Sequence, residues 1–350
     1  MKRIASFLFS SLVVPAVLVP AVHADVTLAE TVRVDGKGLM AMASMTIDST
    51  TYISGNKARI DNNVSNTSGL VRMFGGAGPS GQIVRLDQDM LYELNLKKKR
   101  YRQVSLADQR AEMQKAMAAA EDAQASQSDA MVGVDESQCE WSEPRADVQR
   151  TGEKATVAGL PTERVKITAT QSCTDRKTKS VCDFSLVFDQ WLTPRFAAAD
   201  ETLAYHRNYA EKMGISGTGS ADFTQRAQQS FGRYKGIWEK IGKEMQNIQG
   251  YPLKSSFALG FGGPQCSSAS TAQQNAGPGA ANPLGQLGGQ LGGLFGGRKK
   301  QQEEAAPAPE VKMDNGLVPL MVVSSELKSV SQSAVSLDLF EVPAGFKQEK

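Results

Sequence analysis

Four cysteines, Cys139, Cys173, Cys182 and Cys266, are the residues of this 350-residue sequence best suited to covalent chemistry. An even number of cysteines in an exported chain is typical of disulfides, and none of the spacings is the Cys-x-x-Cys of a metal site. Cys173 and Cys182 flank the polar stretch TDRKTKSV between two strand-like runs. We therefore expect a Cys173–Cys182 bond across a hairpin and, by elimination, a Cys139–Cys266 bond.

Residues suited to acid–base catalysis are sparse. The sequence holds two histidines, His23 and His206, and His23 lies within an N-terminal leader. Asp87, Asp89 and Glu93 are close in sequence, but acidic residues are ordinary in turns between strands. A Ser-His-Asp arrangement around His206 stays open, because such triads assemble from residues distant in sequence. We expect no enzyme, no metal and no cofactor.

Residues 1–24 have the pattern of a secretory signal peptide. Two basic residues precede an apolar run from Ile4 to Val22, and Val-His-Ala ends the segment. We expect cleavage after Ala24 and a periplasmic mature chain. A membrane anchor is the alternative, but two prolines interrupt the run and it is short for a span. No cysteine follows the cut, which disfavours a lipid-anchored lipoprotein, and no later stretch is apolar enough to cross a bilayer.

The basic run KKKR at residues 97–100 raises the question of a nucleic-acid partner. The full chain has 39 basic and 37 acidic residues, and loss of the leader removes Lys2 and Arg3. The mature chain is then close to neutral, which argues against nucleic acid or an anionic membrane as a partner. The run also follows a strand-like segment, and lysines keep a sheet edge soluble. We therefore expect it in a hairpin turn at an edge.

Apolar periodicity predicts antiparallel strands through most of residues 25–103 and 139–193, and hence an α+β fold. Ser105 begins a capping-box pattern, so a helix is expected from there to about residue 125. A second helix is expected to end at Gly214, and a third carries one continuous apolar face. The residues of that face are Phe223, Ala227, Phe231, Tyr234, Trp238, Ile241, Met245 and Ile248. Further strands are expected at residues 251–261, 318–332 and 334–347.

One stretch, residues 263–310, departs from the rest in composition. It is rich in Gly, Ala, Gln and Pro, which is typical of a flexible insertion. Its leucines give an alternative, a weak membrane-interface stripe, which the intervening glycines oppose because they disfavour a helix. We expect residues 25–262 and 311–350 to form a single domain that this insertion interrupts.

Five segments resemble, in order and character, a family of uncharacterised bacterial exported domains. They are YISGNKARID, RLDQDMLYELNLKKKRY, VAGLPTERVKI, VVSSELKSVSQ and LFEVPAGF. That family is similar to the outer-membrane lipoprotein-carrier superfamily, and the resemblance covers most of residues 25–262 and 311–347. It implies a curved antiparallel sheet, a half-open barrel, that wraps or packs on helices.

The resemblance also implies a binding or carrier function, because members of the wider superfamily hold acyl chains or unfolded envelope proteins on the concave face. We expect a lipid or other apolar ligand, with Phe231, Tyr234, Trp238 and Ile241 lining its site. Packing in the protein's own core is the plainer interpretation of these four side chains. The alternative function is that of an envelope interaction module that binds a protein partner through the insertion at 263–310.

Overall fold

A computed structural model describes residues 25–36, 44–66, 78–127, 139–214, 235–263, 266, 313 and 317–349. The predicted signal peptide, residues 1–24, lies outside the described residues. So does nearly all of the predicted insertion at 263–310, of which Gly263 and Cys266 are described.

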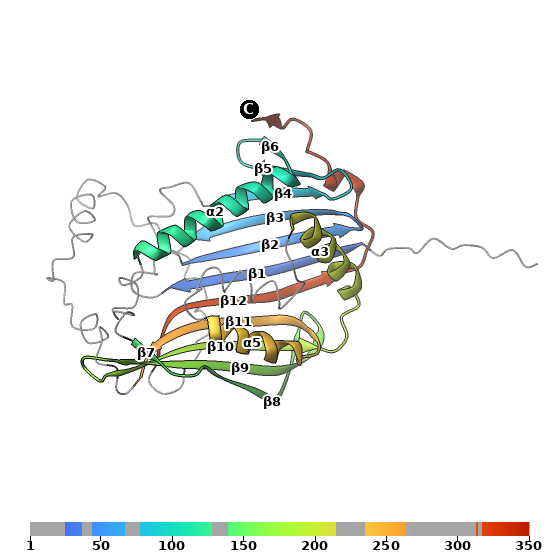
Figure 1. The fold of residues 1–350 in the computed structure, drawn as a ribbon. Coiled ribbons are helices and arrows are strands. Elements are labelled where there is room, and N and C mark those ends of the chain that lie inside the picture. The colour runs from blue at the N-terminus through green and yellow to red at the C-terminus, as the bar shows by residue number, and fades with distance from the viewer. Residues whose placement is uncertain are drawn as a thin grey trace, which may run out of the picture.

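Thirteen strands form one large sheet that does not close on itself (Figure 1). One edge is β13 (Lys347–Gln348), and at the other β7 (Cys139–Trp141) and β8 (Arg145–Val157) both pair with β9 (Leu160–Asp175). Between these edges lie, in spatial order, β6 (Arg100–Ser105), β5 (Met90–Asn95), β4 (Gly78–Arg85), β3 (Lys57–Asn66), β2 (Met45–Ser54), β1 (Val26–Gly36), β12 (Leu317–Ser331), β11 (Tyr251–Gly262) and β10 (Val181–Thr193). Each pairing is antiparallel except that of β13 with β6. A mainly antiparallel sheet with helices is therefore confirmed.

Alternation along the strands gives the sheet two unlike faces, because successive side chains point to opposite sides. In β1 the positions of Val26, Val32 and Val34 face one side, while those of Thr27 and Thr31 face the other. The antiparallel register carries this division across neighbouring strands. A sheet with one apolar face is built to bury that face against other elements.

Three helices lie on the same side of the sheet, which we call the helix face (Figure 1). They are α2 (Leu106–Gln127), α3 (Ala199–Met213) and α5 (Lys235–Gln246). Two apolar cores form beneath them. Tyr205 of α3 packs in a core with Val26 and Ile53, and Ile237 of α5 packs in a second core with Phe188. Within the described ranges, no helix is long and apolar enough to span a membrane.

Local sequence signals set several element boundaries as predicted. The hydroxyl of Ser105 accepts a hydrogen bond from the backbone N–H of Asp108 at 3.0 Å, which caps the start of α2. Gly214 ends α3 with φ of 67°, a conformation that glycine adopts at little cost. The basic run 97–100 lies in the β5–β6 turn and at the start of β6, so its predicted place in a hairpin is confirmed.

The predicted strand at 334–347 is wrong for nearly all of its length. Leu337–Phe340 is a short 3-10 helix, η4, and pairing begins only at β13. The ring of Phe340 is buried on the face opposite the helices, in a small core with Ile83 and Leu94. Side-chain contacts, among them the buried ring of Phe340, therefore hold this segment in place of a ladder, to which Pro343 could donate no N–H.

Candidate functional site

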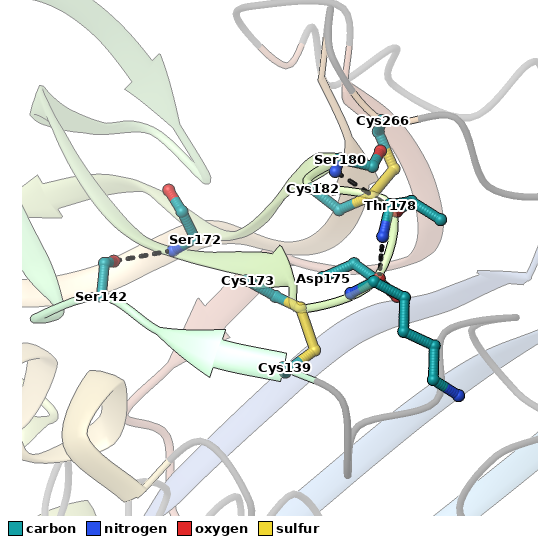
Figure 2. The surroundings of a disulfide bond; sticks show 10 residues. Cys139, Ser142, Ser172, Cys173, Asp175, Thr178, Ser180, Cys182 and Cys266 are labelled. Carbon is teal, nitrogen blue, oxygen red and sulfur yellow. Dashed lines mark hydrogen bonds between the residues drawn. A yellow bond between two sulfur atoms is a disulfide. The ribbon is translucent and has the colours of Figure 1, made fainter.

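The four cysteines lie in a row across one end of the sheet, where two disulfides join them in pairs (Figure 2). Cys139 bonds Cys173 with a Cα–Cα distance of 5.2 Å, and Cys182 bonds Cys266 with a Cα–Cα distance of 4.5 Å. The prediction that all four form disulfides is confirmed. The predicted pairs, Cys173 with Cys182 and Cys139 with Cys266, are wrong.

The order of the strands explains the observed pairs. Cys173 of β9 and Cys182 of β10 are directly opposite in the register, as a hairpin requires. However, β7 places Cys139 on the outer side of β9, and Cys266 follows β11 on the outer side of β10. A bond between the two middle cysteines would leave the outer pair about three strand spacings apart, ~14 Å, and disulfides span at most about 7 Å between Cα atoms. When each middle cysteine instead bonds the outer cysteine on its own side, all four cysteines form disulfides.

A patch of half-buried apolar side chains occupies the helix face of three central strands. Its members, which we call the apolar floor, are Val32, Val34, Met45, Ile47 and Val64. The register sets Val32 opposite Ile47, and Ile47 opposite Val64, so the floor is continuous across β1, β2 and β3. Among the described residues, no floor residue belongs to a buried core cluster.

The described helices pack beside this floor. The main contacts of α2 are with α3 and β6, and those of α5 are with β8 and β9. α3 is fastened to the far end of β2, where the carboxylate of Glu201 accepts a hydrogen bond from the backbone N–H of Gly55 at 2.8 Å. The floor thus lies in the central strands, with α2 and α3 toward one edge of the sheet and α5 toward the other (Figure 1).

A line of polar residues adjoins the floor on the same face. Glu30 of β1 is opposite Ser49 of β2, which is opposite Asn62 of β3. Glu30 is hydrogen-bonded to Ser325 of β12, and burial raises the pKa of the Glu30 carboxyl above its ordinary range, although this hydrogen bond opposes the rise. The hydroxyls of Ser325 and Ser255 are in turn 2.8 Å apart. The helix face therefore presents a carboxyl and hydroxyl groups next to apolar side chains.

The predicted ligand-lining residues lie only in part within the described residues. Phe231 and Tyr234 lie outside the described residues. Trp238 lies on α5, and its side chain is outside the described part of the structure. Ile241 is 0% exposed and packs in the α5 core, so its surface is taken up by the protein itself. A role for these residues in ligand contact stays a prediction.

The acidic residues near position 90 are paired with cations. Asp87 pairs with Arg85 at 2.9 Å, Asp89 with Lys212 at 2.5 Å, and Glu93 with Arg102 at 2.8 Å. His206 is exposed on α3, and its ring makes a T-shaped contact with the ring of Tyr205.

A shallow hollow of about 390 Å³ lies on the opposite face of the same central strands. Short side chains such as Thr31 and Thr50 form its base, and Asp48, Asp61 and Lys328 are also in its lining. Asp48 accepts a hydrogen bond from Thr31 at 2.7 Å, and Asp61 pairs with Arg59 at 3.0 Å. The carboxylates of Asp48 and Asp61 are thus satisfied within the protein.

Comparison of the chain with protein-family models, with curated proteins and with solved structures found no match. The likeness to the lipoprotein-carrier superfamily therefore stays a prediction from the sequence.

Proposed function

We propose that the protein is an exported, periplasmic, non-catalytic carrier that binds an acyl chain or another apolar ligand on the helix face of its sheet. In this proposal the sheet and its helices act as the half-open barrel of the lipoprotein-carrier superfamily. The ligand lies on the apolar floor, between α2 and α3 on one side and α5 on the other.

The apolar floor is the observation that carries the proposal. Val32, Ile47 and Val64 continue the alternation that buries Val26 and Ile53 in the core further along the same strands. An apolar residue at every second position of a strand specifies a face that is buried in the functional state of the protein. The floor residues are half-buried and outside the core clusters of the described residues, so an apolar ligand would complete their burial.

The free energy gained by burying an acyl chain on the apolar floor is sufficient for reversible binding. Each methylene moved from water onto an apolar surface contributes about 0.8 kcal/mol, so six methylenes would contribute about 5 kcal/mol. Part of this is offset by the loss of freedom on association. The two disulfides fit an oxidising compartment such as the periplasm.

The test compares two substitutions on neighbouring residues of β2 that face opposite sides. Ile47→Asn places an amide on the floor, and we expect roughly tenfold weaker binding of a neutral fluorescent apolar dye, because a polar group is then desolvated without a partner. Thr46→Asn, on the other face of the same strand, is the matched control and should leave binding unchanged. Absence of dye binding by the unmodified protein, or equal losses in both variants, would contradict the proposal.

A further inference from the structure

Glu30 lies at the border between the apolar floor and the polar line of Ser49 and Asn62. Its neighbours along that side of β1 are Leu28 and Val32, and its neighbour across the strands in β12 is Leu327, which is buried. An ionised carboxylate in such surroundings is costly unless a cation or several hydrogen-bond donors accompany it. A position that needed only packing would be better filled by an apolar residue.

Among the described residues, the side chain that forms a hydrogen bond with Glu30 carries a hydroxyl and not a cation. Ser325 is the side chain hydrogen-bonded to it, and Ser255 lies 2.8 Å beyond Ser325. The nearby lysines of this region, Lys254 and Lys328, pair with Glu326, whose strand position faces the other side of the sheet. Both lysines are therefore engaged with Glu326.

We propose that Glu30, with Ser325 and Ser255, is a head-group site for a cationic amphiphile, a long-chain amine whose ammonium pairs with the carboxylate. This inference rests on the proposed function, because the chain of the same ligand would lie on the apolar floor. Charge complementarity decides the head group. An ammonium neutralises the carboxylate, whose hydrogen-bond partner among the described residues is the hydroxyl of Ser325, and donates hydrogen bonds to the surrounding hydroxyls, whereas an anionic head would be repelled.

The spacing along β1 suits such a molecule. Residues two apart on one face of a strand are about 6.6 Å apart, so Glu30 and Val34 are separated by about 13 Å of strand. Val32 lies between them on the same face, next to Ile47 of β2. A ligand held at Glu30 by its head would therefore lay its chain over the floor.

The experiment uses three probes with the same twelve-carbon chain: dodecylammonium, dodecanol and dodecanoate, each below its micellar concentration. Binding to the mature protein at pH 7 is measured by calorimetry. We expect dodecylammonium to bind roughly tenfold more tightly than dodecanol, as for a hydrogen-bonded charge pair, and dodecanoate to bind more weakly than both.

Glu30→Gln keeps an oxygen and an amide for Ser325 but removes the charge, and it should abolish the preference among the probes. Asp48→Asn is the matched control, because Asp48 sits on the opposite face of β2 with Thr31 as its partner. This variant should keep the preference. Near-ultraviolet circular dichroism verifies that both variants are folded.

The outcomes separate the two claims. Equal binding of all three probes by the unmodified protein overturns the head-group site and leaves the apolar floor in place. Failure of every probe to bind overturns the proposed carrier function together with the head-group site. A preference that survives Glu30→Gln overturns the assignment of the head group to Glu30.

Discussion

At the scale of single residues, Arg85 fastens the C-terminal segment to the sheet. Its side chain is 8% exposed and donates two hydrogen bonds to the carboxylate of Asp87, each at 2.9 Å. It also donates to the carboxylate of Glu341 and to the backbone carbonyl of Phe340. The hydrogen bonds from Arg85 lower the pKa of Asp87 below its ordinary range. The guanidinium of Arg85 thus links β4 to the C-terminal segment that carries Phe340. The ring of Phe340 is buried on the face of the sheet opposite the helices.

Arg85→Ala is expected to lower the free energy of unfolding by about 2 to 3 kcal/mol at pH 7, because the charged hydrogen bonds of a buried group are lost. The folded-state pKa of Asp87 is depressed, so its contribution is present above the unfolded value, 3.8, and is lost as the pH falls through the folded pKa. The difference between the two proteins should therefore shrink at pH 3. Urea unfolding at both pH values measures it.

Arg102→Ala is the control for this prediction. Arg102 also bonds two carboxylates, those of Glu93 and Glu112, but its side chain is 43% exposed. Exposed ion pairs contribute little, so the loss should be clearly smaller than for Arg85→Ala. Equal losses in the two variants would show that burial of Arg85 is not what makes its bonds matter.

At the scale of elements, the hairpin β9–β10 holds two cysteines that are directly opposite yet bonded elsewhere. Directly opposite residues in antiparallel strands have Cα atoms about 4.5 to 5.5 Å apart, which is within the range of a disulfide. The choice of partner is therefore made by the flanking strands and not by the hairpin itself.

Joint replacement of Cys139 and Cys266 by serine should consequently let Cys173 and Cys182 bond to each other. Peptide mapping without reduction would detect the new bond. The double variant should be less stable, because each native disulfide of this kind typically contributes about 2 to 5 kcal/mol. In the reciprocal variant, Cys173→Ser with Cys182→Ser, the outer cysteines are too far apart, and thiol labelling should find two free thiols. A Cys139–Cys266 disulfide in that variant would contradict the observed order of the four cysteines across the sheet.

At the scale of the whole molecule, sequence reasoning succeeded where structure depends on neighbours in the chain. The serine cap at Ser105, the glycine at Gly214 and the hairpin turn with the basic run 97–100 are all decided within a few residues. Antiparallel strands and the helix α5 followed from the apolar period, which is also a local property.

Features that depend on strand order could not be read in the same way. The pairing of Cys173 depends on β7, which joins the outer side of β9 from a distant part of the chain. The burial of Phe340 depends on β4 and β5. Glu30 was missed because a single acidic residue in an alternating strand has no local mark, and its setting becomes visible only once β12 brings Ser325 beside it.

The central claim, an apolar ligand on the helix face, is tested most directly by native mass spectrometry of the protein purified gently from the periplasm, its proposed compartment, with lipid extraction in parallel. The account predicts a stoichiometric adduct in the mass range of a lipid or long-chain amphiphile, and its loss from the Ile47→Asn variant but not from Thr46→Asn. A clean mass of the protein alone, with no extractable amphiphile, would contradict the account.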